Sequence, residues 1–520
     1  MALVCAGRCP GTGRSPQRPG GVDPVASRAR ARDTGPVNAP GTPATAGAST
    51  PLGAGPGDLG ADPPGRPGPG APGPRARQDS LVARFLRYSA VPSQSDAGAT
   101  TVPSSPGQRE LAELLAAELR AAGAADVHLS ATSVLTARVP ASLPPGHAPV
   151  PPVGFCVHLD TADAGLSPRV RARVIDYVGG DVRLSEPWDE GEEDPDAVWL
   201  RVSEHPEVGR YTGDRLLVTD GTSVLGADDK AAVATVMEAL TDVLADPGIP
   251  HGEVYLAAVP DEEIGLRGVR TLDLGRFPVR YAWTLDCCGL GEVCWQTFNA
   301  AAVTVRIRGV CAHPMSAKGV LVNPLLVAHD VVARLDRTRT PECTEGTEGF
   351  TWAQEMTADP STATLGLIVR DHDLTRFRGR VQEVLDVVDQ VRALHPRARL
   401  EVEVEDTYGN IADALTPANR AGIDLVLGAM DALGITPRPV AMRGGTDGSW
   451  LSRQGILTPN VFTGAHNFHS ACEFLPLSSF ERSHALVRTL MTLVARQVAV
   501  AAVATAAPVL AALGRVAAQR

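Results

Sequence analysis

The sequence contains almost no lysine. Of its 48 lysine and arginine residues, only Lys230 and Lys318 are lysines. Both lie inside conspicuous motifs, at 226–230 and 313–319, whereas arginine serves wherever positive charge alone is needed. An ammonium group is a compact point charge and a guanidinium group is a planar fork. The two lysines therefore mark candidate positions at which the shape of the cation matters.

Other shortages narrow the class of protein. The net charge of -11 removes any general attraction to nucleic acid or to anionic membranes. Nine cysteines occur without a C-x-x-C pair, which favours reduced thiols and a cytoplasmic protein over a disulfide framework. No membrane span is expected either. The apolar run 498–513 is mostly alanine, is broken by Thr505 and Pro508, and falls short of the ~20 strongly apolar residues required.

The length of 520 residues predicts two or three domains. Residues 1–77 are rich in glycine, proline, alanine and arginine and lack hydrophobic periodicity, so we expect a disordered tail, with a transit peptide as the alternative. Between the tails, an α/β pattern is interrupted by a small α+β pattern that we expect to form a lid. In chain order, we expect a large domain at 78–298, an inserted lid at 299–411, the rest of the large domain at 412–496 and an alanine-rich helical tail at 497–520.

Apolar spacing predicts the individual elements. In the large domain we expect strands at 153–157, 254–259 and 281–285, helices at 81–88, 107–122 and 231–244, and a long irregular acidic stretch at 173–214. In the inserted segment we expect a strand at 302–310, a helix at 324–335, a strand at 362–369, a helix at 375–394 and a strand at 399–405. This second order resembles a split βαβ, ferredoxin-like arrangement.

Polar islands follow the apolar strands of the large domain. His158-Leu-Asp160 follows the first, Asp261-Glu-Glu263 the second and Asp286 the third. Ligands of an open α/β sheet bind outside the carboxyl ends of its strands, so we expect these islands to meet Asp228-Asp229 and His469 there. Carboxylates gathered at one point would repel one another without a cation. The sequence therefore predicts a divalent metal site.

The glutamate pair carries most of this argument. Glu262 and Glu263 follow an apolar strand and are poorly explained as a solvated face. One of them can bind metal while the other takes a proton from metal-bound water, whose pKa falls towards ~7. The other islands are ambiguous alone, because a surface histidine would explain His158, Asp228 can cap a helix, and His466 competes with His469.

A glycine-rich loop at 443–448 presents an arginine. It lacks the G-K-[ST] of a phosphate-binding loop. The Arg443 guanidinium would suit a carboxylate or a tetrahedral oxyanion. Cys287 and Cys288, beside Asp286, are expected to be plain buried thiols rather than metal ligands.

At these residues the sequence resembles the peptidase T group of tripeptide aminopeptidases, within the M20 family of co-catalytic zinc peptidases. The resemblance extends from Asp79 to Ala495. The shared motifs, in family order, are H-x-D-T, T-D-G-T-x-x-L-G-A-D-D-K-A, P-D-E-E-I-G, H-P-x-S-A-K-G, R-G-G-T-D-G and N-F-H. The resemblance implies a zinc-aminopeptidase-like α/β catalytic domain with an inserted ferredoxin-like lid.

The resemblance also implies a ligand set for two Zn²⁺ ions, although other divalent metals are possible with mixed oxygen and nitrogen ligands. One zinc would be held by His158, Asp228 and Asp286, and the second by Asp228, Glu263 and His469, with Asp228 bridging.

Roles for the remaining site residues follow from the same resemblance. Asp160 would orient His158, and Glu262 would be the general base. His313 would come from the lid to stabilise the oxyanion. Arg370 and Arg443 would contact the backbone or the terminal carboxylate of the peptide.

One segment departs from the family pattern. After the last zinc histidine the family usually has H-G-K-H-E-F, whereas this chain has His469-Ser-Ala-Cys-Glu-Phe474. Both basic side chains are gone, which leaves the choice of peptide length open. We expect a cytoplasmic aminopeptidase, monomeric or homodimeric, that acts on short peptides and foremost on tripeptides. The alternatives are an M20-type dipeptidase or N-acyl-amino-acid hydrolase, and an inactive metal-retaining protein that binds peptides.

Overall fold

The computed structural model describes residues 73–185 and 196–496. The alanine-rich tail predicted at 497–520 and nearly all of the tail predicted at 1–77 lie outside these residues. The first helix, α1 (Pro74–Ser89), begins inside the predicted tail and earlier than the helix expected at 81–88. Its first residues are polar, so the apolar spacing gave no sign of them.

The largest sheet has eight strands in the order β1-β2-β8-β3-β9-β16-β10-β15. Strands β8 (Val254–Val259), β3 (Val153–His158), β9 (Tyr281–Cys287) and β16 (Asn460–Phe462) run parallel to one another in its centre. The flanking strands are β1 (Ala125–Leu129), β2 (Leu135–Val139), β10 (Glu292–Gln296) and β15 (Arg438–Ala441). The three strands expected from apolar runs are therefore three of the four central ones.

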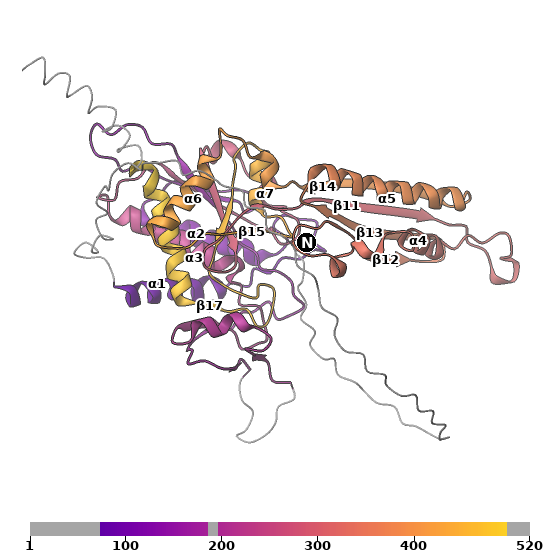
Figure 1. The fold of residues 1–520 in the computed structure, drawn as a ribbon, viewed down its shortest axis with the longest axis horizontal. Helices are drawn as coiled ribbons and strands as arrows, with labels where there is room; N and C mark the ends of the chain where they lie inside the picture. Colours follow the sequence, from indigo (N-terminus) through magenta and orange to yellow (C-terminus); the bar gives the residue numbers. More distant parts are fainter. Residues whose placement is uncertain (1–72, 186–195, 497–520) are drawn as a thin grey trace, which may run out of the picture. The chain divides into compact units, whose positions relative to one another are not determined.

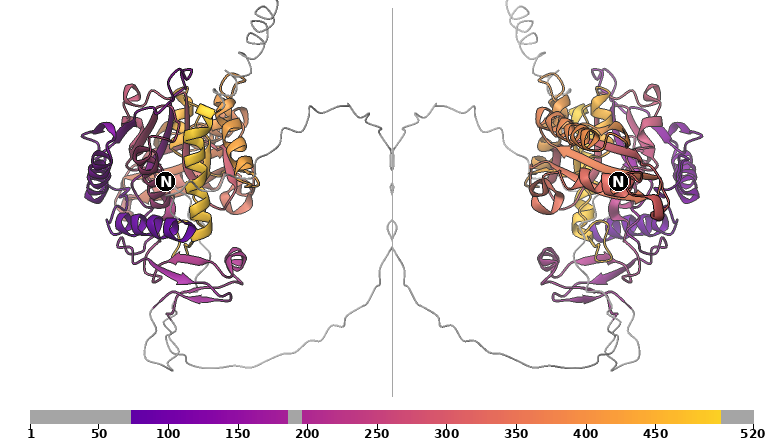
Figure 2. Two further views of the ribbon diagram at one scale, coloured as in Figure 1. Left: turned by 90° about the vertical axis from the view of Figure 1, so that its left-hand side faces the viewer. Right: turned by 90° about the vertical axis from the view of Figure 1, so that its right-hand side faces the viewer.

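Both faces of this sheet are covered, which explains why its central strands are continuously apolar. In β3, Phe155 and Val157 face one hydrophobic cluster, whereas Cys156 faces another. The first cluster contains residues of α1, α2 (Pro106–Ala122), α3 (Ala227–Ala245), α6 (Ala421–Ala432) and the helical residues 477–496. The second contains Leu451 of α7 (Asp447–Arg453). Figure 2 shows the C-terminal helix beside α1, where the rings of Phe85 and Phe480 lie 6.2 Å apart.

The lid segment (residues 299–411) folds as an antiparallel sheet with two helices (Figure 1). Its strands are β11 (Asn299–Arg308), β12 (Phe350–Ala358), β13 (Thr362–Asp371) and β14 (Arg399–Tyr408), in the order β12-β13-β11-β14. Helices α4 (Pro324–Val332) and α5 (Leu374–Leu394) pack on one face through a shared apolar cluster. This is the split βαβ order predicted from the sequence, with β12 as a strand that the prediction omitted.

The stretch expected to be irregular contains regular structure. Strand β4 (Arg173–Asp176) pairs with β7 (Arg215–Val218), and β7 pairs with β17 (Leu475–Pro476) from far along the chain. A separate pair joins β5 (Val182–Arg183) to β6 (Trp199–Leu200). These strands are too short to give a clear alternation, and their partners are distant in sequence. Across residues 73–185 and 196–496, no helix is long and apolar enough to cross a membrane.

Candidate metal centre

The predicted metal ligands lie where the central strands end. His158 is the last residue of β3, Glu262 and Glu263 follow β8, and Asp286 is the next-to-last residue of β9. Because these strands are parallel neighbours, their ends share one edge of the sheet. Asp228 reaches this edge from the start of α3, before the chain adopts helical geometry.

Two histidines converge on the carboxylate of Asp228. His158 Nε2 lies 2.9 Å from Asp228 Oδ1, and His469 Nε2 lies 3.0 Å from Asp228 Oδ2. His469 Nε2 is also 2.8 Å from Glu263 Oε1. One ligand atom from each of His158, Asp228 and Glu263 fits within a span of 4.8 Å. The Asp228 carboxylate thus faces one imidazole with each oxygen, as a bridging ligand must.

Asp160 holds the neighbouring chain segments in place. Its side chain is completely buried, and its two oxygens accept hydrogen bonds from the backbone N–H groups of Glu262 (3.0 Å) and Glu263 (3.1 Å). Its Oδ1 also lies 3.4 Å from His158 Nδ1. One carboxylate therefore fixes the glutamate pair and touches the far side of an imidazole whose Nε2 faces Asp228.

Burial and mutual charge shift the pKa values of this cluster. Burial, reinforced by neighbouring carboxylates, raises the pKa of Glu262, Glu263 and Asp286. Burial also disfavours the charge of Asp228, but hydrogen bonds from the two histidines outweigh it and lower the pKa of that carboxyl. For His469, burial is outweighed by Glu263 and Asp228, which raise its pKa to about 12. The cluster has an excess of carboxylates over cations and so favours bound positive charge.

Two further carboxylates, which the sequence prediction did not assign, line a small pocket beside His158, Glu262 and Asp286. Asp229 accepts a hydrogen bond from the His158 backbone N–H at 3.0 Å through Oδ2. Its Oδ1 and the Oδ1 of Asp447 are buried and have no hydrogen-bond partner among the described residues. Asp447 belongs to the glycine-rich segment 443–448, in which the sequence predicts a role for Arg443 alone. Burial raises the pKa of Asp447 to about 7.

The donor set suits a divalent ion such as zinc. It offers imidazole nitrogens and carboxylate oxygens, the hard and borderline ligands that zinc, manganese and cobalt accept. Asp229 and Asp447 each add a buried carboxyl oxygen that has no hydrogen-bond partner among the described residues. Asp286 is oriented by Asn460, whose Oδ1 accepts the Asp286 backbone N–H at 2.6 Å. All seven cysteines of the described residues are free thiols, including Cys287 and Cys288.

The two arginines predicted to bind substrate, Arg370 and Arg443, donate hydrogen bonds to other residues of the same chain. Arg443 donates hydrogen bonds to the carbonyl oxygens of Gly346 (3.2 Å) and Glu348 (3.0 Å) and to Thr344 Oγ1 (2.8 Å). Arg370 is 4% exposed and donates to the Arg443 carbonyl oxygen at 2.9 Å. Both guanidinium groups also lie over the ring of Phe350. These contacts connect the lid segment to the loop at 443–448. The predicted contact of Arg370 and Arg443 with substrate stays a prediction.

His313 is not brought to the cluster within one chain. It is exposed and caps a single helical turn, where its Nδ1 accepts the Met315 backbone N–H at 3.2 Å. It follows the end of β11, whose first residue, Asn299, pairs with Asp371. A strand of this length spans roughly 30 Å. His313 therefore lies at the opposite end of the lid sheet from that pair, and its predicted role is untested.

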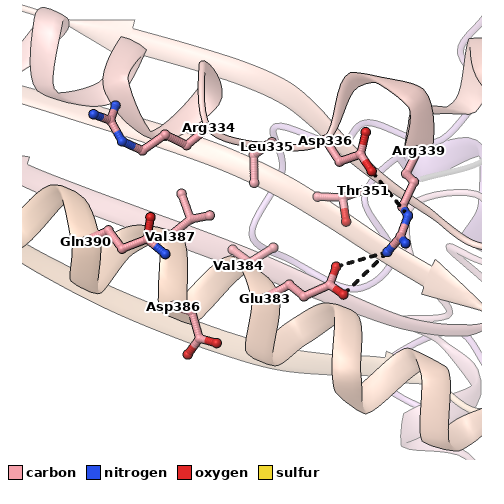
Figure 3. A pocket seen from close by; sticks show the side chains of 10 residues that line it. All are labelled: Arg334, Leu335, Asp336, Arg339, Thr351, Glu383, Val384, Asp386, Val387 and Gln390. Carbon is pink, nitrogen blue, oxygen red and sulfur yellow. Dashed lines mark hydrogen bonds and ion pairs between the residues drawn. The ribbon is translucent and has the colours of Figure 1, made fainter.

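A larger cavity, of about 360 Å³, lies in the lid segment (Figure 3). It is lined by residues 334–339, which follow α4, by Thr351 of β12 and by α5. It carries charges of both signs, and Arg339 there already pairs with Asp336 at 3.3 Å and Glu383 at 3.4 Å. None of the predicted metal ligands lines it. The chemistry of the molecule lies instead at the strand ends of the large sheet.

Imidazoles and carboxylates gathered at the strand ends of an α/β sheet, beside an additional buried glutamate, define a metal-dependent hydrolase. The model of peptidase family M20/M25/M40 matches residues 225–493. A peptidase T-like protein of Yersinia pestis is 48% identical over 415 residues, covering 80% of this chain and 98% of that protein. The peptidase T of Brevibacillus brevis is 36% identical over 400 residues, covering 77% and 94%. The chain belongs to peptidase family M20/M25/M40, and it is a metallopeptidase of the peptidase T kind, as the sequence predicted.

The fold agrees with this assignment. A tripeptidase structure from Staphylococcus aureus superposes with a TM-score of 0.60 at 21% identity, covering 81% of this chain and 99% of that one. The predicted fold class, a mixed α/β catalytic domain with a smaller lid domain, is confirmed at this level.

Proposed function

We propose that this protein removes the N-terminal residue from short peptides, foremost tripeptides, in the cytoplasm. The observation that carries the proposal is the convergence of His158 and His469 on Asp228, with Glu263 against His469. Glu262 lines the small pocket beside His158. The peptidase T relatives support the choice of substrate class. Free thiols throughout the described residues agree with a reducing compartment.

The ligand assignment is the one that the resemblance to the peptidase T group implies. His158, Asp228 and Asp286 would hold one ion, and Asp228, Glu263 and His469 the second. Zinc suits this set best. When bound, the two ions would polarise the scissile carbonyl and lower the pKa of water at the site.

Glu262 is the residue that would move the proton. Its side chain is 8% exposed, and burial raises its pKa well above the usual value, which makes its carboxylate a stronger base. It would take the proton from the attacking water and deliver it to the leaving amine. Asp160 accepts a hydrogen bond from the Glu262 backbone and contacts His158. Through these two contacts it would fix the position of the base, Glu262, relative to the ligand His158.

Glu262→Gln tests the proposal most directly. Turnover of a tripeptide should fall by about 10³-fold or more, because the base is lost. The zinc content should stay near that of the unmodified protein, because Glu262 is not a ligand in this assignment. Glu204→Gln removes an exposed glutamate and serves as the matched control, with activity expected to be unchanged.

A substrate panel separates the alternatives. Tripeptides, dipeptides and N-acyl amino acids should be assayed with metal analysis on the same preparation, with and without EDTA. Preference for dipeptides or N-acyl amino acids would favour the related hydrolases. Peptide affinity without turnover at full zinc occupancy would instead identify an inactive peptide-binding protein.

A further inference from the structure

The loop that carries His469 is closed at its neck by a paired backbone. The His466 N–H donates to the Phe474 carbonyl oxygen at 2.9 Å, and the Phe474 N–H donates back at 3.1 Å. The two rings stack with centroids 4.9 Å apart, and the Tyr211 hydroxyl lies 2.8 Å from His466 Nε2. The neck of the loop is therefore rigid, whereas His469 itself lies near the tip with a positive φ of 60°.

Glu473 connects this loop to the segment that carries Asp228. Its side chain is 1% exposed. Its Oε2 accepts the Gly226 backbone N–H at 2.8 Å, and its Oε1 accepts the Asp228 backbone N–H at 3.2 Å. One carboxylate thus bridges two segments that lie far apart in sequence and that each contribute a predicted ligand of the second ion.

Gly226 has little freedom to find another partner. It has a φ of 69°, and a Cβ at this position would meet Thr161 Cγ2 at 2.9 Å. The backbone is therefore tightly enclosed between the His158–Thr161 segment and Glu473. Two buried N–H donors in this position would be left without an acceptor if the carboxylate were removed.

We propose that Glu473 is a positioning residue for the second metal site. It sets the distance between His469 and Asp228 by holding the backbone of one segment with the side chain of the other. The inference rests on the proposed function only in that it takes His469 and Asp228 as ligands of a shared ion. Residues that orient ligands in this way typically alter metal affinity by about 10- to 100-fold when replaced.

The test compares Glu473→Gln, Glu473→Asp and the surface control Glu204→Gln in the full chain. Zinc alone is the probe, titrated in competition with a chromophoric chelator. Glu473→Gln keeps the size of the side chain, but its amide NH₂ group would face one of the two N–H donors, which would lose its acceptor. One of the two zinc equivalents should therefore bind about 10- to 100-fold more weakly. Glu473→Asp keeps the charge and should recover part of the loss. At saturating zinc, the KM for a tripeptide should stay within about twofold.

Wild-type affinity for both zinc equivalents in Glu473→Gln would overturn the inference. If that variant does not fold, hydrogen exchange on the unmodified, metal-free protein decides the question. The amides of Gly226 and Asp228 should then be protected as strongly as those in the middle of α3, and fast exchange would refute the bridge. Zinc binding without peptide hydrolysis by the unmodified protein would sink the proposed function alone and leave this inference intact.

Discussion

Replacing Asp160 by asparagine tests how the centre is held together. Asp160 is completely buried and accepts two backbone hydrogen bonds, from Glu262 at 3.0 Å and Glu263 at 3.1 Å. Asparagine has nearly the same shape but only one acceptor oxygen. Its amide group would face one of the N–H donors, and one buried donor would lose its partner.

The size of the effect follows from that loss. A buried donor left without a partner costs about 1–3 kcal/mol. Loss of a residue that orients ligands typically lowers activity by about 10- to 100-fold, so displacement of Glu262 and His158 should lower kcat/KM by that amount. The free energy of unfolding should fall by about 1–3 kcal/mol as well.

The assay is tripeptide hydrolysis at saturating zinc, with chemical denaturation of the same preparation. Asp163→Asn, at an exposed position shortly after Asp160, is the matched control and should behave as the unmodified protein. A normal kcat/KM for Asp160→Asn with both zinc equivalents bound would refute the orienting role. Loss of stability with normal activity would show that the contacts serve the fold alone.

Two further predictions concern stability. His469 has its pKa raised to about 12 and Glu473 to about 8. The folded metal-free protein therefore binds more protons than the unfolded chain, and its melting temperature in EDTA should fall from about pH 7 to about pH 8. Zinc-loaded protein should not follow this trend, because metal binding releases protons; a rise in EDTA would contradict the reasoning. Gly107→Ala should cost about 1–3 kcal/mol or more in chemical denaturation, since its Cβ would lie 1.7 Å from the Pro92 carbonyl oxygen. Gly379→Ala, in the exposed interior of α5 with no atom within 4 Å, should instead gain up to ~1 kcal/mol, and equal effects would disprove the steric argument.

Most of the architecture could be predicted because its signals are local. The central strands are buried on both faces and are continuously apolar, so β3 and β8 were placed within a residue of their observed ends. Strand β12 was not predicted because it is an edge strand whose residues 355–358 are exposed, so that it lacks a continuous apolar run. The sheet formed by β4, β7 and β17 was not predicted because β7 pairs with β17, which is distant in sequence.

The site was predicted to the extent that residue type and order determine it. The expected ligands His158, Asp228, Glu263 and His469 lie together. Glu473 and Asp447 were missed because only the tertiary fold brings them to the cluster. Both stand inside motifs, at 469–474 and 443–448, in which another residue has a predicted role, so an acidic residue within such a motif was the one available signal.

The surroundings of Lys230 give a physical reason for a lysine at this position in a chain that otherwise uses arginine. This side chain is 1% exposed, and its ammonium donates to the Val91 carbonyl oxygen at 3.0 Å. Burial lowers its pKa to about 8, against the attraction of Asp160 and Glu473. These are the two carboxylates that hold the backbone of the glutamate pair and of Asp228. A compact cation between them can favour both negative charges at once, whereas a guanidinium group would need room for a planar fork and for five donors. Lys318, by contrast, is exposed in the lid, so the shape argument applies to one of the two lysines.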